Sequence, residues 1–168
     1  MYFQSSDTVA GNSVGSSDAP SVDPPSGQRP ARDGRRPVVA VIEDGGIVSQ
    51  EFGMVCEFFD IAVHPVSTYA DLGTVLPVLR PMAVVCEADG EGQDGCNVMK
   101  AVAGYDRALP VMIVTGPNPM LAGAIDAVGE VWQLSEVTAL PSIPSAAGLV
   151  DFLFRAGRQA RCGQFLQG

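Results

Sequence analysis

Carboxylates gather where apolar segments end. Glu43 and Asp44 directly follow the apolar run at residues 38–42, Glu87 closes a second apolar run, and Asp89 comes two residues later. If the two runs are neighbouring parallel strands, three of these acids meet at one edge of the sheet. They would raise one another's pKa unless a divalent metal, a shared proton or a basic group is present. Oxygen ligands suit Mg²⁺, with Asp44 and Glu87 as candidate ligands. The structural alternative is that acids at strand ends cap the following helices.

Thiol and imidazole groups give a weaker signal. His64 is the only histidine, and no C-x-x-C pair occurs among the four cysteines, which are Cys56, Cys86, Cys96 and Cys162. A zinc site is therefore poorly supported. Cys56 and Cys86 fall in apolar segments, which favours buried, reduced thiols, with a redox switch as the alternative. The chain has no Gly-x-Gly-x-x-Gly after the first strand, no P-loop and no Ser-His-Asp set, so we expect no enzyme.

Apolar runs and amphipathic segments alternate along the chain from residue 37. Short apolar runs predict strands at residues 38–42, 61–66, 82–87, 109–115 and 131–134. Apolar residues at helical spacing predict helices at residues 47–59, 69–79, 95–105, 118–128 and 145–161, the last after a connection at 138–144. Five strand–helix units in strict alternation predict an α/β fold with a doubly wound, five-stranded parallel sheet of flavodoxin-like order 2-1-3-4-5.

Composition divides the chain into three parts. Residues 1–36 are rich in Ser, Gly, Pro, Asp and Arg, which predicts a flexible leader, and its start resembles the remnant of a protease site used in protein expression. Residues 37–162 are expected to form the domain and residues 163–168 a tail. The four Asp and four Arg of the leader cancel, so the net charge of −9 belongs to the rest. This acidic domain, without an apolar stretch of about 18 residues, predicts a cytoplasmic protein that binds neither nucleic acid nor membrane.

The order of these residues resembles that of response-regulator receiver domains, the CheY-like family, over residues 37 to about 160. Four landmarks carry the resemblance: the acidic pair Glu43-Asp44, Glu87 at the position of the phosphoacceptor, Asp94-Gly95 at the end of a loop, and Thr115-Gly116 after strand four. The resemblance implies that the acidic pair and the acceptor hold Mg²⁺, that a histidine kinase donates the phosphoryl group and that the Thr115 hydroxyl moves toward it. It also implies an inward aromatic in strand five, for which Trp132 is the candidate.

Three departures separate the chain from this family pattern. The acceptor position carries Glu87, whose extra methylene moves the carboxylate about 1.5 Å further out than an aspartate would. The family places a lysine and a proline after strand five, but no lysine follows the strand predicted at 131–134, and the only lysine of the chain is Lys100. Pro117 and Pro119 stiffen the loop after strand four, which moves in the family. Together the departures predict a pseudo-receiver.

We therefore expect an atypical receiver of a bacterial signalling protein that works by phosphate-independent contact with another signalling protein or with itself, as a homodimer. The expected face comprises the helix at 118–128, the strand at 131–134 and the helix at 145–161. Its candidate contact residues are Trp132, Phe152, Phe154, Arg155 and Arg158. The plainer alternative is that the aromatics belong to the core and the arginines to a solvated face.

Other functions stay open. The first is a phosphorylatable response regulator that uses Asp44 or Asp89 as a substitute acceptor together with Mg²⁺. The second is small-ligand binding by a flavodoxin-like domain. Glu87 could also mimic a phosphorylated aspartate, although the sequence shows no counter-charge near it. Phosphate-independent contact, by contrast, requires no cofactor.

Overall fold

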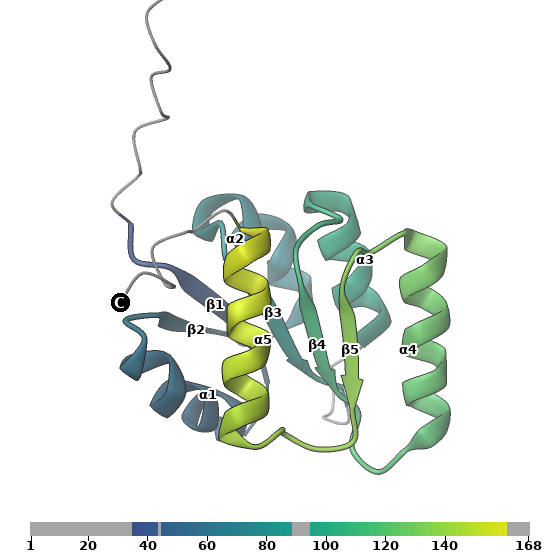
Figure 1. The fold of residues 1–168 in the computed structure, drawn as a ribbon. Helices are drawn as coiled ribbons and strands as arrows, with labels where there is room; N and C mark the ends of the chain where they lie inside the picture. The colour runs from purple at the N-terminus through teal and green to yellow at the C-terminus, as the bar shows by residue number, and fades with distance from the viewer. Residues whose placement is uncertain (1–34, 44, 89–94, 161–168) are drawn as a thin grey trace, which may run out of the picture. The chain divides into compact units, whose positions relative to one another are not determined.

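The computed structural model describes residues 35–43, 45–88 and 95–160. They form one five-stranded parallel sheet with helices on both faces (Figure 1). The strands are β1 Val38–Ile42, β2 Ala62–Val66, β3 Ala83–Glu87, β4 Val111–Val114 and β5 Val137–Leu140. The helices are α1 Ile47–Phe58, α2 Leu72–Leu79 after a short 3₁₀ turn at Tyr69–Asp71, α3 Gly95–Tyr105, α4 Pro119–Trp132 and α5 Ala146–Gln159. The order β2-β1-β3-β4-β5 confirms the predicted doubly wound fold.

Two buried clusters lie on opposite faces of the sheet. Successive side chains of a strand point to opposite faces. Accordingly, Val39 and Val41 pack with α1 and α5, whereas Ala40 and Ile42 pack with α2, α3 and α4. In Figure 1, α5 crosses in front of the strands and α3 lies behind them. Strands covered on both faces need continuous apolar runs, which is why β1, β3 and β4 are almost wholly apolar and buried.

Local capping sets where helices begin. Asn118 precedes α4, and its Oδ1 accepts a hydrogen bond from the N–H of Met120 at 3.1 Å. Pro119 occupies the first turn, where proline costs little, as the sequence predicted. Ser145 caps α5 in the same way through the N–H of Gly148. These caps place the starts of α4 and α5 close to the positions expected from the sequence.

The fifth strand lies further along the chain than predicted. The segment 131–134 is not a strand, because α4 continues to Trp132 and Gln133 ends it in the left-handed conformation. β5 instead forms at the start of the predicted connection and pairs with β4. The strand was predicted because Val131 and Trp132 are residue types that favour strands. The structure forms a helix there because Trp132 continues the helical spacing of the apolar residues of α4. The inner side of α4 carries Leu121, Ile125, Val128 and Trp132.

Two of the thiols are buried. Cys56 on α1 and Cys86 on β3 are fully buried. Burial raises the pKa of the Cys56 thiol to about 11, against a smaller opposing effect of the positive charge of Arg36. The thiolate, which is the reactive form, is therefore scarce at neutral pH. This environment favours the interpretation of Cys56 as a buried, reduced thiol.

Helix length bears on the membrane question. The longest helices of the described residues, α4 and α5, have 14 residues each, whereas a helix that spans a bilayer needs about 20. Within that part of the chain, no helix combines the length and the apolar character needed to cross a membrane.

Candidate functional site at the carboxyl edge of the sheet

Three predicted site residues lie at the carboxyl ends of neighbouring strands. Glu43 follows β1, Glu87 ends β3 and Thr115 follows β4. β1, β3 and β4 are adjacent and parallel, and the register sets Glu87 opposite Val114. Their ends therefore form one edge of the sheet, which is where ligands bind in doubly wound folds. Glu87 itself is half-buried at this edge.

Glu43 serves as a helix cap. It is buried, and its two carboxylate oxygens accept from the backbone N–H of Ser49 at 3.1 and 3.0 Å. Ser49 lies in the first turn of α1, where backbone N–H groups have no partner within the helix. Gly46, at φ +74°, supplies the left-handed residue that the turn before the helix requires. Glu43 thus has the capping role that was the alternative to metal binding.

Glu43→Ala is expected to lower the free energy of unfolding by about 1–2 kcal/mol. The change leaves the N–H of Ser49 without its acceptor and removes a negative charge from the helix N-terminus. Glu43→Gln keeps one acceptor oxygen and is the matched control, with a smaller expected loss. Urea denaturation followed by circular dichroism gives both values. Near-zero losses in both variants would contradict the capping role.

The described residues do not by themselves fit a magnesium ion. Among them, no three His, Cys, Asp or Glu side chains come together as a metal site. Both oxygens of Glu43 are engaged with Ser49, whereas Mg²⁺ takes about six oxygen ligands. Asp44 and Asp89, which complete the predicted acidic pocket, lie outside the described residues. The pairing of Asp44 with Glu87 as metal ligands therefore stays a prediction.

Thr115 is buried and bonded to the neighbouring strand. Its N–H donates to the carbonyl oxygen of Leu140 at 2.7 Å. Its Oγ1 lies 3.2 Å from the carbonyl oxygens of both Leu140 and Gly116, and the single hydroxyl proton serves one of them at a time. The predicted switch hydroxyl is therefore satisfied by the backbone, and it ties the end of β4 to the end of β5.

The corrected position of strand five changes the match to the family pattern. β5 ends at Leu140 and Pro141 follows. The chain thus keeps the proline that the family places here and carries a leucine in place of the lysine. Trp132 lies on α4, so the prediction that it is the strand-five aromatic was wrong. Sequence reasoning missed Leu140 because it placed the strand too early, although the Leu-Pro pair was an available signal.

The residues predicted for a contact face do not share one face. Phe152 is fully buried between the sheet and α1, so the prediction that it contacts a partner was wrong. Phe154, two positions later, is half-buried and meets Phe59, the residue directly after α1, edge-on, with ring centroids 5.7 Å apart. Trp132 packs against the buried cluster on the other face of the sheet. The aromatics therefore divide between the core, the α1 side of α5 and the end of α4.

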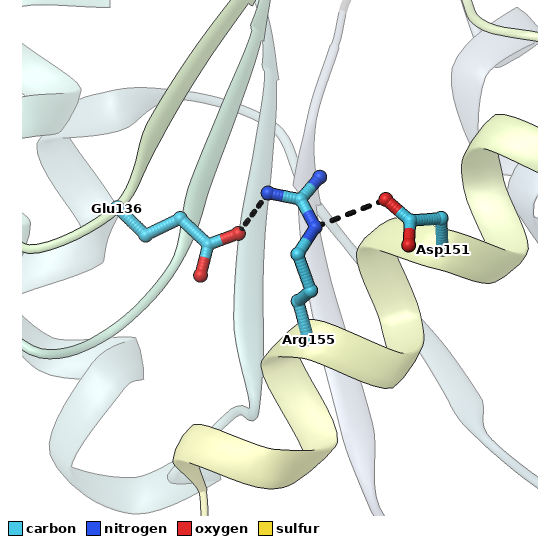
Figure 2. A network of polar contacts seen from close by, with 3 residues as sticks. All are labelled: Glu136, Asp151 and Arg155. Carbon is cyan, nitrogen blue, oxygen red and sulfur yellow. Dashed lines mark hydrogen bonds and ion pairs between the residues drawn. The ribbon is translucent and has the colours of Figure 1, made fainter.

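Arg155 lies between two carboxylates (Figure 2). Its guanidinium pairs with Glu136, and its Nε lies 3.1 Å from Oδ2 of Asp151. Asp151 is one turn earlier on α5, whereas Glu136 directly precedes β5. The network therefore links α5 to the edge strand and engages the charge of Arg155 with two carboxylates. Arg158, one turn later, is exposed and makes no ion pair within 4.0 Å in the described part of the chain.

A groove of about 490 Å³ lies between α2 and α3. Its lining includes Tyr69, Leu76, Lys100 and Tyr105. None of the residues described above at the carboxyl edge lines it. A small ligand in this groove would not meet the acidic edge, so the carboxylates lend no support to the small-ligand alternative.

Comparison of the sequence with protein-family models and with curated proteins finds no match. Solved structures do match the fold. The signal receiver domain of an HD-domain-containing protein from Pseudomonas fluorescens Pf-5 is 16% identical with a TM-score of 0.60, and the match covers 76% of this chain and 99% of that chain. The receiver domain of a modulated diguanylate cyclase from Desulfovibrio desulfuricans G20 is 17% identical with a TM-score of 0.57, over 77% of this chain and 100% of that chain. The beryllofluoride-activated NtrC receiver domain is 19% identical with a TM-score of 0.54, over 73% and 94%. The fold is that of response-regulator receiver domains.

Proposed function

We propose that this chain is a pseudo-receiver: a receiver domain of a bacterial signalling protein that acts by phosphate-independent contact with another protein or with a second copy, and that catalyses no reaction. The observation that carries the proposal is the pair of residues at the carboxyl edge. Glu87 ends β3 where the family has its phosphoacceptor, and Leu140 ends β5 where the family has its lysine. Neither substitution suits phosphoryl chemistry.

The physical objection to phosphorylation concerns charge and position. A bound phosphoryl group carries up to about two negative charges near neutral pH and needs cationic or hydrogen-bonding partners. Leu140 supplies an apolar side chain where the family supplies an ammonium group. Glu87 holds its carboxylate one methylene further from the backbone than an aspartate does. The Thr115 hydroxyl, which would have to reach the phosphoryl oxygen, bonds to backbone carbonyls instead.

Protein contact requires none of these groups and no metal. Once Phe152 is assigned to the core, Phe154, Arg155 and Arg158 remain as candidate contact residues on α5, whereas Trp132 is a separate candidate at the end of α4. Large apolar side chains are also exposed on the helices, which is the kind of surface that a docking partner covers. They include Met54 and Phe58 on α1, Val78 on α2, and Met120 and Val131 on α4.

Incubation of the full chain with Mg²⁺ and either acetyl phosphate or beryllofluoride is expected to leave it unchanged. Mass spectrometry should find no phosphoryl adduct, and the NMR signals of Thr115 and Gly116 should not shift. A receiver that takes up beryllofluoride, such as that of NtrC, serves as the assay control. An adduct on Asp44 or Asp89 would instead support the alternative of a phosphorylatable regulator with a substitute acceptor.

The variant Glu87→Asp/Leu140→Lys provides a matched gain-of-function control. It restores the family's acceptor and its cation, so beryllofluoride with Mg²⁺ is expected to shift the Thr115 signal in this variant and not in the unmodified chain. Each single substitution should respond less than the pair. A beryllofluoride-dependent shift of the same size in the unmodified chain would contradict phosphate independence.

A further inference from the structure

Helix α1 carries an exposed apolar strip. Ile47, Met54 and Phe58 are 60%, 61% and 84% exposed. Their spacing of seven and four residues puts them on one side of the helix. Together they expose on the order of 400 Å² of apolar surface, which matches the largest patch of a typical monomer, and patches of that size often serve binding. We call these three residues the α1 strip.

Aromatic rings extend the α1 strip onto α5. The ring of Phe58 meets that of Phe59 edge-on at 5.1 Å between centroids, and Phe59 meets Phe154 in the same way at 5.7 Å. Phe154 is half-buried on α5. The strip is therefore one half of a wider surface whose centre is this group of three rings and whose other half is the exposed side of α5.

The two halves of this surface differ in charge. The α1 half carries Glu51 and Glu57, both exposed, and no basic residue occurs in α1. The α5 half carries charges of both signs: Asp151 is exposed and pairs with Arg155, and Arg158, one helical turn after Phe154, is exposed and makes no ion pair in the described part of the chain. The apolar centre thus lies between a flank whose charged side chains are all acidic and a flank that offers the cation of Arg158.

We propose that a second copy of this chain covers the α1 strip, with α1 of each copy lying on α5 of the other about a twofold axis near the three rings. An interface with twofold symmetry requires a surface that is complementary to itself. Arg158 of one copy, which has no ion pair among the described residues, meets that requirement when it faces Glu51 and Glu57 of the other copy. Pairing of α1 with α1 is disfavoured, because Glu51 and Glu57 would face acidic residues of the other copy. The proposal rests on the proposed function, names a second copy as the partner and places the contact on α1 and α5, in place of the face predicted from α4, strand five and α5.

Sedimentation velocity of the full chain over roughly 1–500 µM tests the assembly, since interfaces of ordinary size give affinities in or below this range. The unmodified chain is expected to form a dimer. Phe58→Ser should weaken it at least about tenfold, because the substitution removes the largest exposed apolar group from the interface. Met120→Ser changes a residue of α4 that is 83% exposed and outside the surface, so this matched control should leave the dimer intact. Circular dichroism establishes that each variant is folded.

Charge exchange tests the orientation of the two copies. Glu57→Arg and Arg158→Glu should each weaken the dimer, and the combination of both should restore it to within a few-fold of the unmodified chain. A monomer at every concentration, equal effects of Phe58→Ser and Met120→Ser, or a combined variant no better than its parents would each overturn the proposal. So would a monomeric full chain that dimerises only after removal of residues 161–168, because that segment would then be the natural cover of the strip.

The experiments test the proposed dimer and the proposed phosphate independence separately, so that one can be wrong while the other stands. If the chain takes up beryllofluoride but Phe58→Ser still weakens the dimer, phosphate independence is wrong and the proposed surface is supported. If the chain ignores beryllofluoride and remains monomeric, phosphate independence stands and the surface is wrong.

Discussion

Phe152→Ala is expected to lower the free energy of unfolding by about 3–5 kcal/mol. Phe152 is fully buried in the layer between the sheet and helices α1 and α5. Its ring lies edge-on to Phe52 with centroids 6.5 Å apart, so the truncation removes an aromatic contact and leaves a cavity in the centre of that layer. Domains of this size have about 5–15 kcal/mol of stability in total. Urea denaturation followed by circular dichroism measures the loss.

Phe154→Ala is the matched control on the same helix. Phe154 is half-buried and packs at the edge of the layer, against Phe59. Its truncation also removes an aromatic ring but opens no enclosed cavity. The expected loss in the free energy of unfolding is therefore about 1 kcal/mol. Both variants are compared at one protein concentration, because Phe154 also belongs to the proposed dimer surface. Equal losses would contradict the assignment of Phe152 to the core.

Gly95→Val is expected to cost about 1–3 kcal/mol, because the first turn of α3 has no room for a side chain. A Cβ atom at Gly95 would lie 2.9 Å from Cδ1 of Ile125, 3.3 Å from Cβ of Ala88 and 3.4 Å from Cγ2 of Ile113. Ile125 and Ile113 are fully buried, so neither has free space to turn into. Thermal or urea denaturation gives the magnitude.

Gly104→Val is the control for the effect of valine itself. Gly104 lies on the same helix, at the groove between α2 and α3, and a Cβ atom there would meet nothing within 4 Å. Valine is slightly better than glycine in a helix, so the stability should change by less than about 0.5 kcal/mol. A loss at Gly104 as large as that at Gly95 would contradict the close packing of Gly95 against Ile125 and Ile113 as the cause of the destabilisation.

Much of the fold follows from patterns that the sequence displays directly. The runs at β1, β3 and β4 are continuous and apolar because those strands are covered on both faces. β5 was misplaced because an edge strand of four half-buried residues gives a weak signal. Val131 and Trp132, just before β5, are residue types that favour strands, so the strand was predicted there. In the structure these two residues end α4.

The site was less predictable than the fold. The sequence placed Glu43 at the right edge but could not decide between capping and metal binding, since that depends on whether Ser49 presents its N–H to the carboxylate. Phe152 could have been assigned correctly, because it shares the helical spacing of Leu149 and Ala156, which line the buried side of α5. Its neighbourhood of arginines suggested a surface position instead. Leu140 was not recognised as the residue at the position of the family's lysine, because β5 was predicted too early in the chain.

The hydrogen bonds of Thr115 to Leu140 bear on what kind of information the domain can carry. In a switch, this hydroxyl is the part whose position distinguishes two states. A hydroxyl held by the backbone of the adjacent strand favours a single arrangement. Under the proposed function, the domain therefore does not switch between two states in response to phosphorylation. The state that can still change is the fraction of the protein that is dimeric. This fraction depends on the protein concentration in the cell and changes most steeply near the dissociation constant of the dimer.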